Sequence, residues 1–468
     1  VRGVDREVGR TGTRRILHPA GKKTAQFAVE QDGEVRRILE KAARAKNADL
    51  EAWETALRFA ALSAGAKVLS GLVCDIGSGR RDEHLVCSCG ATMESKGLKP
   101  KPLLSILGPV SYVRSMFQCP CCGKTRYPGD EELDVVGTSR TPGLRRMMAR
   151  AGSRSTFKDG RDDLKVYAGI SVSAKDVERV AETIGEEMEA WAKQERSELI
   201  QQDPPSRPEK NIPKLYVCYD GTGVPMVKRE LAGRKGKQPD GSAKTREVKL
   251  GCVFTQTTTD DEGRPIRDPD STTFTGAIEP AEEVGRRIYS EADRRDFHHA
   301  EQTVVLGDGA SWIWNLADLH FHEAVQIIDL YHEREHVSDL CKILFGTDEK
   351  KVIRHRIRWW TDLDAGNVEK IVRKACSRLP TNREQRKKAE REIAYLEKNK
   401  ERMRYGKFRA QGLFVGSGVV EAGCKTVIGQ RLKQSGMEWS VRGANAIISL
   451  RCIMKSGRLE DYWESRCA

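Results

Sequence analysis

No apolar run in the 468-residue sequence approaches the roughly 18 residues that a membrane-spanning helix needs, and the mean hydropathy is -0.58. The first 15 residues are charged and have no apolar stretch behind them, so we expect no secretory signal. The sequence also lacks internal repeats and low-complexity tracts. These absences argue against a membrane, secreted or repeat protein and predict a soluble, cytoplasmic one.

Cysteine is not scarce, but most of the 13 cysteines are scattered singly, which argues against a disulfide framework. Five of them cluster between Cys87 and Cys122. Paired thiols in a reducing compartment indicate metal, so we predict one structural Zn²⁺ held by Cys87, Cys89, Cys119 and Cys122. Because only one residue separates the first pair, His84 could replace a cysteine, and Cys121 could compete with Cys119 or Cys122. Surface thiols without metal are the alternative.

Positive charge is concentrated in one segment. The net charge is 81 minus 68, or +13, and residues 350–409 hold 20 Lys and Arg against 8 Asp and Glu, a local excess of +12. A basic field of this kind favours a polyanionic partner, because each neutralised phosphate releases a counterion. A solvated helical face with ordinary charge mixing is the alternative.

The length allows about three domains. Apolar residues recur at helical spacing before the cysteine cluster, and a proline-rich linker separates a second helical region from a region of short strands. We expect a helical arm at 1–74, a zinc-ribbon-like domain at 75–136, a helical region at 137–203 and an α/β catalytic domain at 214–468 with a basic helical insertion at about 337–410.

Two aspartates are predicted to follow apolar strands. Asp220 ends the run 215–220 and Asp308 follows the run 303–306, and glycines flank both residues. Glycine at such places allows the backbone to approach a ligand closely. Further strands are expected at 248–255 and 324–329, with helices at 281–292 and 312–322. Either aspartate alone is also typical of a helix cap or a turn.

A third acid, Glu421, is the only acidic residue between Glu401 and Glu438 and lies in a helix-like run that also contains Lys425. Two strand-end aspartates and a helical glutamate can hold two divalent cations about 3.5 to 4 Å apart, an arrangement that serves phosphoryl transfer. Hard oxygen ligands favour Mg²⁺ or Mn²⁺.

Other residues are candidates for supporting roles. Asp329 and His332 follow another strand, and their spacing allows either a zinc site with His336 or an ordinary capped helix. The run 164–184, with a turn at Gly169 and a possible cap at Ser173, fits a helix-turn-helix or an α-hairpin equally well. Basic and aromatic residues near Glu421 are candidates for DNA binding, with core packing as the alternative for the tryptophan: Lys425, Arg431, Lys433 and Trp439.

From about Glu34 to Arg451 the sequence resembles bacterial insertion-sequence transposases of the ISKra type, which have an RNase H-like DDE core. The resemblance rests on YVCYDGTGVPMV, TREVKLGCVFTQ, RDPDSTTF, VVLGDGASWIWNLA, IIDLYHEREH and GQRLKQSGMEWSVRGANAIISLRC. It implies that Asp220, Asp308 and Glu421 form the catalytic triad, that Asp329 and His332 form a D-x-x-H element, and that a helical insertion precedes the glutamate.

The implied activity is a bacterial, nucleoid-associated DNA transposase that cleaves at the ends of an insertion sequence and transfers the strand into target DNA. The implied partners are double-stranded DNA, as terminal inverted repeats and target, and further copies of the chain when DNA is bound. A related nuclease or resolvase would use the same metal site, and a domesticated DNA-binding regulator is the third possibility.

Overall fold

The computed structural model describes Gly33, Arg37, Glu40 and residues 50–77, 85–201, 212–236, 238–346 and 348–466. The protein is a mixed α/β structure whose chain divides into two compact units. The first comprises residues 1–151 and 157–177, and the second comprises residues 152–156 and 178–468. The proline-rich linker, His84 and most of the expected helix before residue 47 lie outside the described residues.

The first unit is built around a long antiparallel hairpin. Strands β1 (Glu94–Ser105) and β2 (Gly108–Gln118) pair along most of their length, and the short β3 (Thr125–Arg126) pairs with the end of β2. Leu103, Val110 and Tyr112 from the hairpin pack with Ala66 and Val73 of helix α3 (Leu50–Gly77) in a buried cluster. The hairpin that follows the first cysteine pair therefore has a small core of its own.

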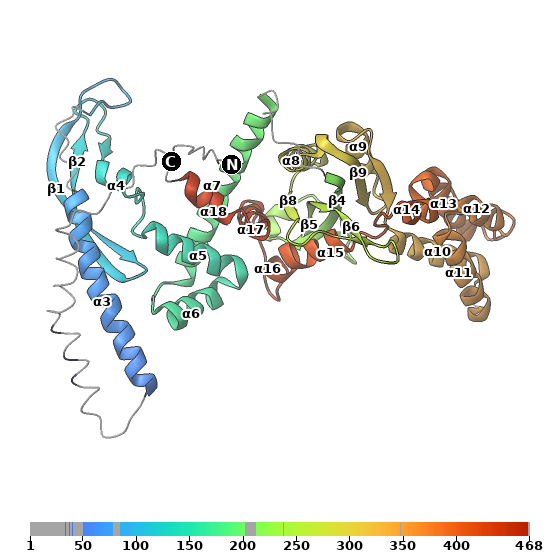
Figure 1. Ribbon diagram of the computed structural model, residues 1–468, viewed down its shortest axis with the longest axis horizontal. Helices are drawn as coiled ribbons and strands as arrows, with labels where there is room; N and C mark the ends of the chain where they lie inside the picture. Colours follow the sequence, from blue (N-terminus) through green and yellow to red (C-terminus); the bar gives the residue numbers. More distant parts are fainter. Residues whose placement is uncertain are drawn as a thin grey trace, which may run out of the picture. The chain divides into compact units, whose positions relative to one another are not determined.

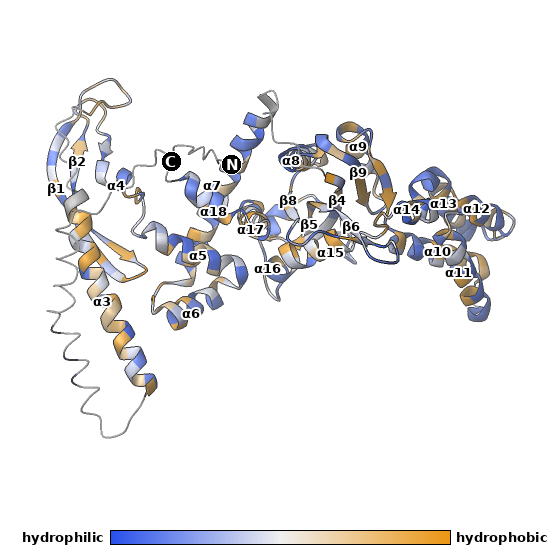
Figure 2. Cartoon of the chain, viewed as in Figure 1, coloured by the Kyte–Doolittle hydropathy of each residue, from blue (hydrophilic) through white to orange (hydrophobic). Residues whose placement is uncertain are grey.

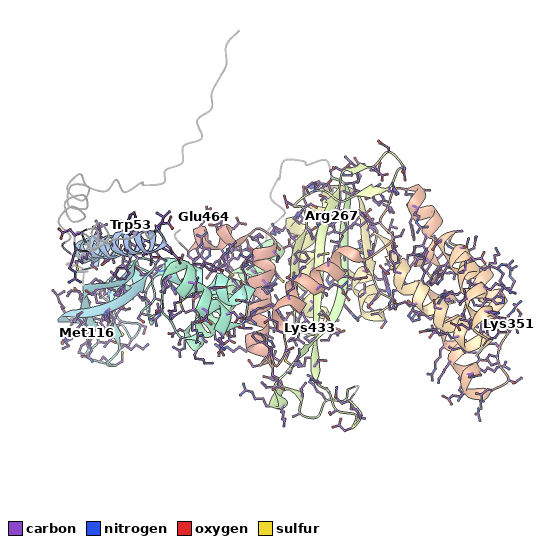
Figure 3. The ribbon with its side chains drawn as sticks, turned by 90° about the horizontal axis from the view of Figure 1, so that it is seen from below. Trp53, Met116, Arg267, Lys351, Lys433 and Glu464 are labelled. Carbon is purple, nitrogen blue, oxygen red and sulfur yellow. The ribbon has the colours of Figure 1, made fainter. Side chains whose placement is uncertain are left out.

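Helix α3 corrects the expectation that no apolar run is long enough to span a membrane. Its residues Leu50–Cys74 are long and apolar enough to pass a length and composition test for a membrane span, with only 17% of the most apolar window buried. Hydrophobic patches run along this helix, which carries Trp53 (Figures 2 and 3). A single such helix is weak evidence for a membrane segment, because helices of soluble proteins pass the same test.

The expected helical pair around Gly169 is present. Helix α6 (Phe157–Ala168) ends at Gly169, whose φ of 71° suits glycine, and α7 (Ala174–Gln201) follows. The Ser173 hydroxyl accepts a hydrogen bond from the Asp176 amide at 3.0 Å, so Ser173 caps α7 as predicted. At 28 residues, α7 is longer than the predicted run. The remaining helices that begin in this part of the chain are α4 (Pro128–Glu132) and α5 (Pro142–Arg154).

The second unit contains a five-stranded sheet with the order β10-β9-β4-β5-β8 (Figure 1). Strands β9 and β10 run parallel to β4, while β5 is antiparallel to β4 and to β8. Apolar β-prone runs form the central strands, in which Val217, Val304 and Val305 are fully buried. The bounds are β4 (Ile212–Pro225), β5 (Thr245–Gln256), β8 (Thr273–Ala277), β9 (Ala300–Gly307) and β10 (Val325–Ile328), with a separate pair β6 (Thr258–Thr259) and β7 (Pro265–Ile266).

Helices connect the strands of this sheet. Helix α8 (Ala281–Arg294) joins β8 to β9, and α9 (Ser311–His320) joins β9 to β10. Val284, Ile288, Ile313 and Ala317 on these helices are buried in the core of the sheet. Short 3₁₀ turns occur at η1 (Lys228–Leu231) and η2 (Phe297–His299).

A block of charged helices lies between β10 and the segment that carries Glu421, as the sequence predicts (Figure 1). It is mainly hydrophilic in Figure 2. Buried Trp359, Leu363, Ile371 and Leu396 form its interior. Its elements are α10 (Leu330–Phe345), α11 (Glu349–Asp364), α12 (Val368–Cys376), α13 (Arg383–Asn399), η3 (Lys400–Met403) and α14 (Tyr405–Ala410).

The chain then returns to the sheet through α15 (Gly418–Gly423), a π-helical turn η4 (Cys424–Gly429) and α16 (Gln430–Leu432). The expected break near Ser435 and Gly436 separates α16 from α17 (Val441–Lys455). The chain described ends with α18 (Leu459–Ser465). A π-helical segment within a helix is often found at functional sites, and here it directly follows Glu421.

Candidate carboxylate and metal sites

The two aspartates lie side by side on neighbouring parallel strands. Tyr219 of β4 is in register with Gly307, the last residue of β9, so Asp220 and Asp308 are the next residues along each strand. We predicted that the first strand ends at Asp220, but β4 continues to Pro225, paired only with β5. The edge of β4 is therefore unpaired with β9 from Asp220 onward, at the position where β9 ends and Asp308 emerges.

Glu421 comes from α15, which packs directly on the sheet. A Cβ on Gly423 would lie 2.7 Å from the Phe274 ring and 3.2 Å from a Leu250 methyl, so only glycine allows this close approach. The Ser417 hydroxyl donates a hydrogen bond to Glu421 Oε1 at 3.2 Å. Helix packing and this bond together hold the glutamate near the aspartate edge of the sheet.

The three carboxylates are close enough to affect one another electrostatically. Partial burial raises the pKa of Asp220 above its ordinary value, and the negative charges of Asp308 and Glu421 raise it further. The Cys424 thiol and the Gly221 amide donate hydrogen bonds to the Asp220 carboxylate and partly offset the effect. The sheet edge therefore accumulates negative charge that a cation would relieve.

The carboxylate oxygens do not converge on one point. Among the described residues, the only group of three or more His, Cys, Asp or Glu side chains whose ligand atoms all lie within 4.8 Å of one another is the cysteine cluster. The oxygens of Asp220, Asp308 and Glu421 do not all lie within that distance of one another. Carboxylate oxygens are ligands that suit Mg²⁺ or Mn²⁺.

Asp329 has a positioning role in this structure. It is the N-cap of α10, where its Oδ1 accepts a hydrogen bond from the His332 amide at 2.7 Å, and its Oδ2 accepts one from the Ser417 amide. Since Ser417 in turn contacts Glu421, the buried Asp329 connects the end of β10 to the third acid. This geometry is that of an ordinary capped helix, which the sequence offered as the alternative to a zinc site. Among the described residues, no metal-binding group includes Asp329 or His332.

Two of the four candidate DNA-binding side chains are accessible. The Lys425 side chain is 78% exposed and lies 3.7 Å from Glu421, and Lys433 donates a hydrogen bond to Thr222 on β4. Figure 3 shows Lys433 beside the strands of the sheet. Lys425 thus lies beside Glu421, and Lys433 lies beside the part of β4 that follows Asp220.

The other two predicted DNA contacts are not compatible with the structure. Arg431 is 0% exposed; its Nε donates to the Gly152 carbonyl at 2.8 Å, and its guanidinium lies 5.0 Å from the Trp439 ring centre. Trp439 is 6% exposed, and its indole donates to the Leu432 carbonyl. We therefore correct the prediction for this pair, because both side chains are used for core packing.

The predicted cysteine ligands converge in the first unit. The Sγ atoms of Cys87, Cys89, Cys119 and Cys122 all lie within 4.8 Å of one another, with Cys87 to Cys122 at 3.5 Å and Cys89 to Cys119 at 3.4 Å. Sulfurs around a tetrahedral zinc would be about 3.8 Å apart. Cys121 is exposed and lies outside the group. The cluster therefore has the residues and geometry to bind a metal such as zinc.

Backbone amides favour the thiolate form at two of these cysteines. The pKa of the Cys87 thiol is lowered to about 6, chiefly by the backbone amide of Cys89 and then by the Cys122 side chain. The pKa of Cys119 is lowered chiefly by the Cys122 amide. Against the amides of Ala91 and Lys124, hydrogen bonds to Cys119 and Cys87 raise the pKa of Cys89 to about 12 and raise that of Cys122. Cys87 and Cys119 thus favour the thiolate, which is the form that binds metal.

Sequence reasoning missed several residues at the carboxylate site. Ser417 contacts Glu421, Cys424 contacts Asp220, and Tyr395 lies against Gly309. Glu333 accepts a hydrogen bond from Tyr395. Tyr395 is the least expected, because it comes from the helical block and lies against Gly309. The sequence signal for Ser417 and Cys424 was their closeness to Glu421, but no local pattern indicates Glu333 or Tyr395.

The fold and the site together define an α/β protein with a carboxylate cluster at one edge of its central sheet. In comparisons with known proteins, a family described as "Uncharacterised protein family (UPF0236)" matches residues 287–466, a range that includes Asp308 and Glu421. The chain is 24% identical over 360 residues to a UPF0236 protein in the vanSb 3′ region of Streptococcus gallolyticus, covering 73% of this chain and 70% of that protein.

A search of solved structures aligns the Drosophila P element transposase strand transfer complex with 68% of this chain and 79% of that one. The TM-score is 0.22 and the sequence identity is 10%. The family match and the Streptococcus gallolyticus protein show that this chain is similar to UPF0236 proteins.

Proposed function

We propose that this protein is a DDE transposase, a metal-dependent enzyme that cleaves DNA at the ends of an insertion sequence and joins them to target DNA. One observation carries the proposal. Asp220 and Asp308 emerge from adjacent parallel strands, and Glu421 lies close enough to raise the pKa of Asp220 together with Asp308. Such a charge cluster is costly without cations and suited to holding them.

The sheet supports an RNase H-like core. Numbered along the chain within the sheet, the strand order is fifth, fourth, first, second, third, with the first three antiparallel and the last two parallel to the first. This is the arrangement expected of the RNase H-like core that the sequence resemblance implies. The acids then lie on the first strand, after the fourth strand and on the helix that returns to the sheet.

The helical block supports a DNA partner. On α11 and α13, exposed basic side chains include Arg354, Arg358, Lys387 and Arg391. The field is strong enough to affect a neighbour, since burial and then the charges of Arg378, Arg354, Arg358 and Lys374 lower the pKa of His355. Figure 3 shows Lys351 of α11 at the far end of the block. Duplex DNA is the polyanion that the proposed activity requires.

In the proposed reaction, Asp220, Asp308 and Glu421 would hold two Mg²⁺ or Mn²⁺ ions, which supply Lewis acidity to the attacking and leaving oxygens. A water oxygen forms a bond to phosphorus at the element end while the bond from phosphorus to the 3′ oxygen breaks, which leaves a 3′ hydroxyl. That hydroxyl then attacks a target phosphodiester and displaces a second 3′ oxygen. Lys425 and Lys433 would hold the phosphates, and the number of phosphodiester bonds is unchanged in the second step.

The test is a strand-transfer assay with the purified full-length chain, a labelled duplex carrying the DNA that flanks its gene, plasmid target and Mg²⁺ or Mn²⁺. The matched variant is Glu421→Gln, which keeps the side-chain shape and removes the charge. We expect joined products with wild type and a loss of at least about 10³-fold with the variant, because electrostatic stabilisation of phosphoryl transfer is lost.

The outcomes separate the competing activities. Cleavage without joining would identify a nuclease or resolvase, and DNA binding without either activity would identify a regulator. Joining that persists at the wild-type rate in Glu421→Gln would overturn the assignment of the third acid.

A further inference from the structure

We propose that Tyr395, held by the buried Glu333, is a positioning residue that fixes the Asp308 loop from the helical block. The inference rests on the proposed function, because it assigns to this pair a role in arranging a metal ligand. It goes beyond the triad, because both residues belong to helices α10 and α13, outside the sheet that carries the two aspartates.

The contact with the loop is unusually close. A Cβ built on Gly309 would lie 1.8 Å from the Tyr395 hydroxyl and 2.7 Å from the ring carbon that bears it. Only glycine therefore fits beneath Tyr395. Gly309 links Asp308 to Ala310, whose amide donates a hydrogen bond to the Asp308 carboxylate at 2.9 Å. Contact at Gly309 thus restricts the backbone that holds the Ala310 amide against the Asp308 carboxylate.

The sequence predicts that the glycine after Asp308 lets the backbone approach a ligand closely. In the structure the Tyr395 ring occupies that space, so Gly309 is required for contact between the loop and α13. Gly309 therefore allows helix α13 to reach the edge of the sheet that carries the two aspartates.

Tyr395 is itself fixed from two sides. Its hydroxyl donates a hydrogen bond to Glu333 Oε1 at 2.6 Å, and Glu333 is 0% exposed. On the ring, the His336 imidazole stacks with centres 4.7 Å apart, and His336 Nδ1 lies 2.8 Å from Glu392 Oε2. Glu333 Oε2 is buried without a hydrogen-bond partner among the described residues. Among the described residues, Tyr395 is therefore the hydrogen-bond donor to this buried carboxyl group.

The charges around the pair agree with a neutral, hydrogen-bonded arrangement. Burial raises the pKa of Glu333 to about 7, and the neighbouring charges of Asp329 and Glu392 act in the same direction against the opposing effects of Tyr395 and His336. Burial, Glu333 and then Asp308 raise the pKa of Tyr395, so its hydroxyl remains a donor. A fixed side chain packed against the loop is what a rigid metal-ligand loop needs.

The experiment measures metal affinity rather than activity. Isothermal calorimetry with Mn²⁺ on the full-length chain compares wild type with Tyr395→Phe, which removes one hydroxyl and keeps the ring. We expect Mn²⁺ affinity to fall about 10-fold or more, because loss of a residue that orients a metal ligand commonly has that effect. The Mg²⁺ concentration that gives half-maximal cleavage should rise by the same factor.

Two matched variants separate positioning from folding. Tyr405→Phe removes another buried hydroxyl of the helical block, one that has no hydrogen-bond partner among the described residues, and should leave Mn²⁺ affinity unchanged. Glu333→Gln retains an acceptor for Tyr395 and should also stay within about 3-fold of wild type, whereas Gly309→Ala should weaken binding as much as Tyr395→Phe.

Wild-type Mn²⁺ affinity in Tyr395→Phe, or an equal loss in Tyr405→Phe, would overturn the positioning role while leaving the proposed function in place. If wild type binds no Mn²⁺, or if its Mn²⁺ binding persists in Asp308→Ala, the proposed function fails and the inference fails with it. The wild-type titration therefore distinguishes the two failures.

Discussion

The two candidate metal sites of this chain differ in how complete they are. In the first unit, four sulfurs lie within 4.8 Å of one another, and amides of neighbouring residues lower the pKa of Cys87 and Cys119. In the second unit, three carboxylates share one sheet edge without converging, and their charges raise the pKa of Asp220. Amides favour two thiolates at one site, while at the other site carboxylates repel one another and Lys425 lies 3.7 Å from Glu421.

This difference follows the general contrast between structural and catalytic metal sites. A structural zinc site is closed by four protein ligands, whereas a catalytic site keeps positions for water and substrate. Under the proposed function, Asp220, Asp308 and Glu421 would leave such positions for phosphate oxygens. Each prediction below tests whether the first site is structural and the second is held open for reaction.

The largest expected effect concerns the cysteine cluster. We expect wild type to carry one Zn²⁺ per chain, and Cys119→Ser to carry none, because Cys119 is nearly fully buried within the group. The measurement is metal content by mass spectrometry, together with hydrogen exchange of the full chain. Exchange should rise at residues 85–93 and 119–126, while β1 and β2 near Leu103 and Val110 keep protection because they also pack on α3.

Cys121→Ser is the control, since Cys121 is exposed and outside the group. It should retain its zinc and its exchange protection. Equal zinc loss in both variants would show that the ligand set is wrong, and wild type without zinc would remove the structural half of the comparison.

The second prediction concerns the open site. In EDTA, Asp220→Asn should be more stable than wild type by about 1 kcal/mol, because the substitution removes a charge that is partly buried and repelled by Asp308 and Glu421. Since the pKa of Asp220 is raised on folding, wild type is most stable at pH below the unfolded value and loses stability as the pH rises through the folded pKa. The gain of the variant should therefore be seen at pH 7 and shrink toward pH 3.

Denaturant unfolding at both pH values measures this effect, with and without Mg²⁺. Mg²⁺ should stabilise wild type and leave Asp220→Asn unchanged. Asp240→Asn is a suitable control, because Asp240 is an exposed loop residue whose pKa is lowered by hydrogen bonds from Ser242. A variant at Asp220 that is less stable than wild type in EDTA would contradict the repulsion argument.

Local sequence patterns predicted much of this open site. Apolar runs around Val217 and Val304 indicated buried strands, and the isolated acid at Glu421 indicated the third ligand. The strand β8 was missed because Thr273–Ala277 is short and rich in threonine, and its burial depends on pairing with β5. Its pairing partner lies in another part of the sequence, which a local pattern does not reveal.

Side chains that act through distant partners were predicted less well. Arg431 has the charge of a surface residue, but packing against Trp439 and a backbone acceptor makes it part of the core. Tyr395 and Gly309 lie far apart in the sequence and meet only when the helical block has folded beside the sheet. The four clustered cysteines were easier to identify, because their residue type and their arrangement in two pairs already indicate a metal site.

The smallest expected effect would sharpen the comparison at the surface of the open site. Lys433→Gln should weaken binding to duplex DNA by a few-fold near 0.1 M salt and lower the salt dependence of binding by about one unit, because one phosphate contact is lost. Lys96→Gln is the control, since Lys96 is exposed like Lys433 but belongs to the hairpin of the first unit, where it pairs with Glu94. Fluorescence anisotropy over a salt series measures both slopes. If the two variants change the slope equally, Lys433 has no special contact with DNA, and the lysines beside the carboxylates contribute only to overall charge.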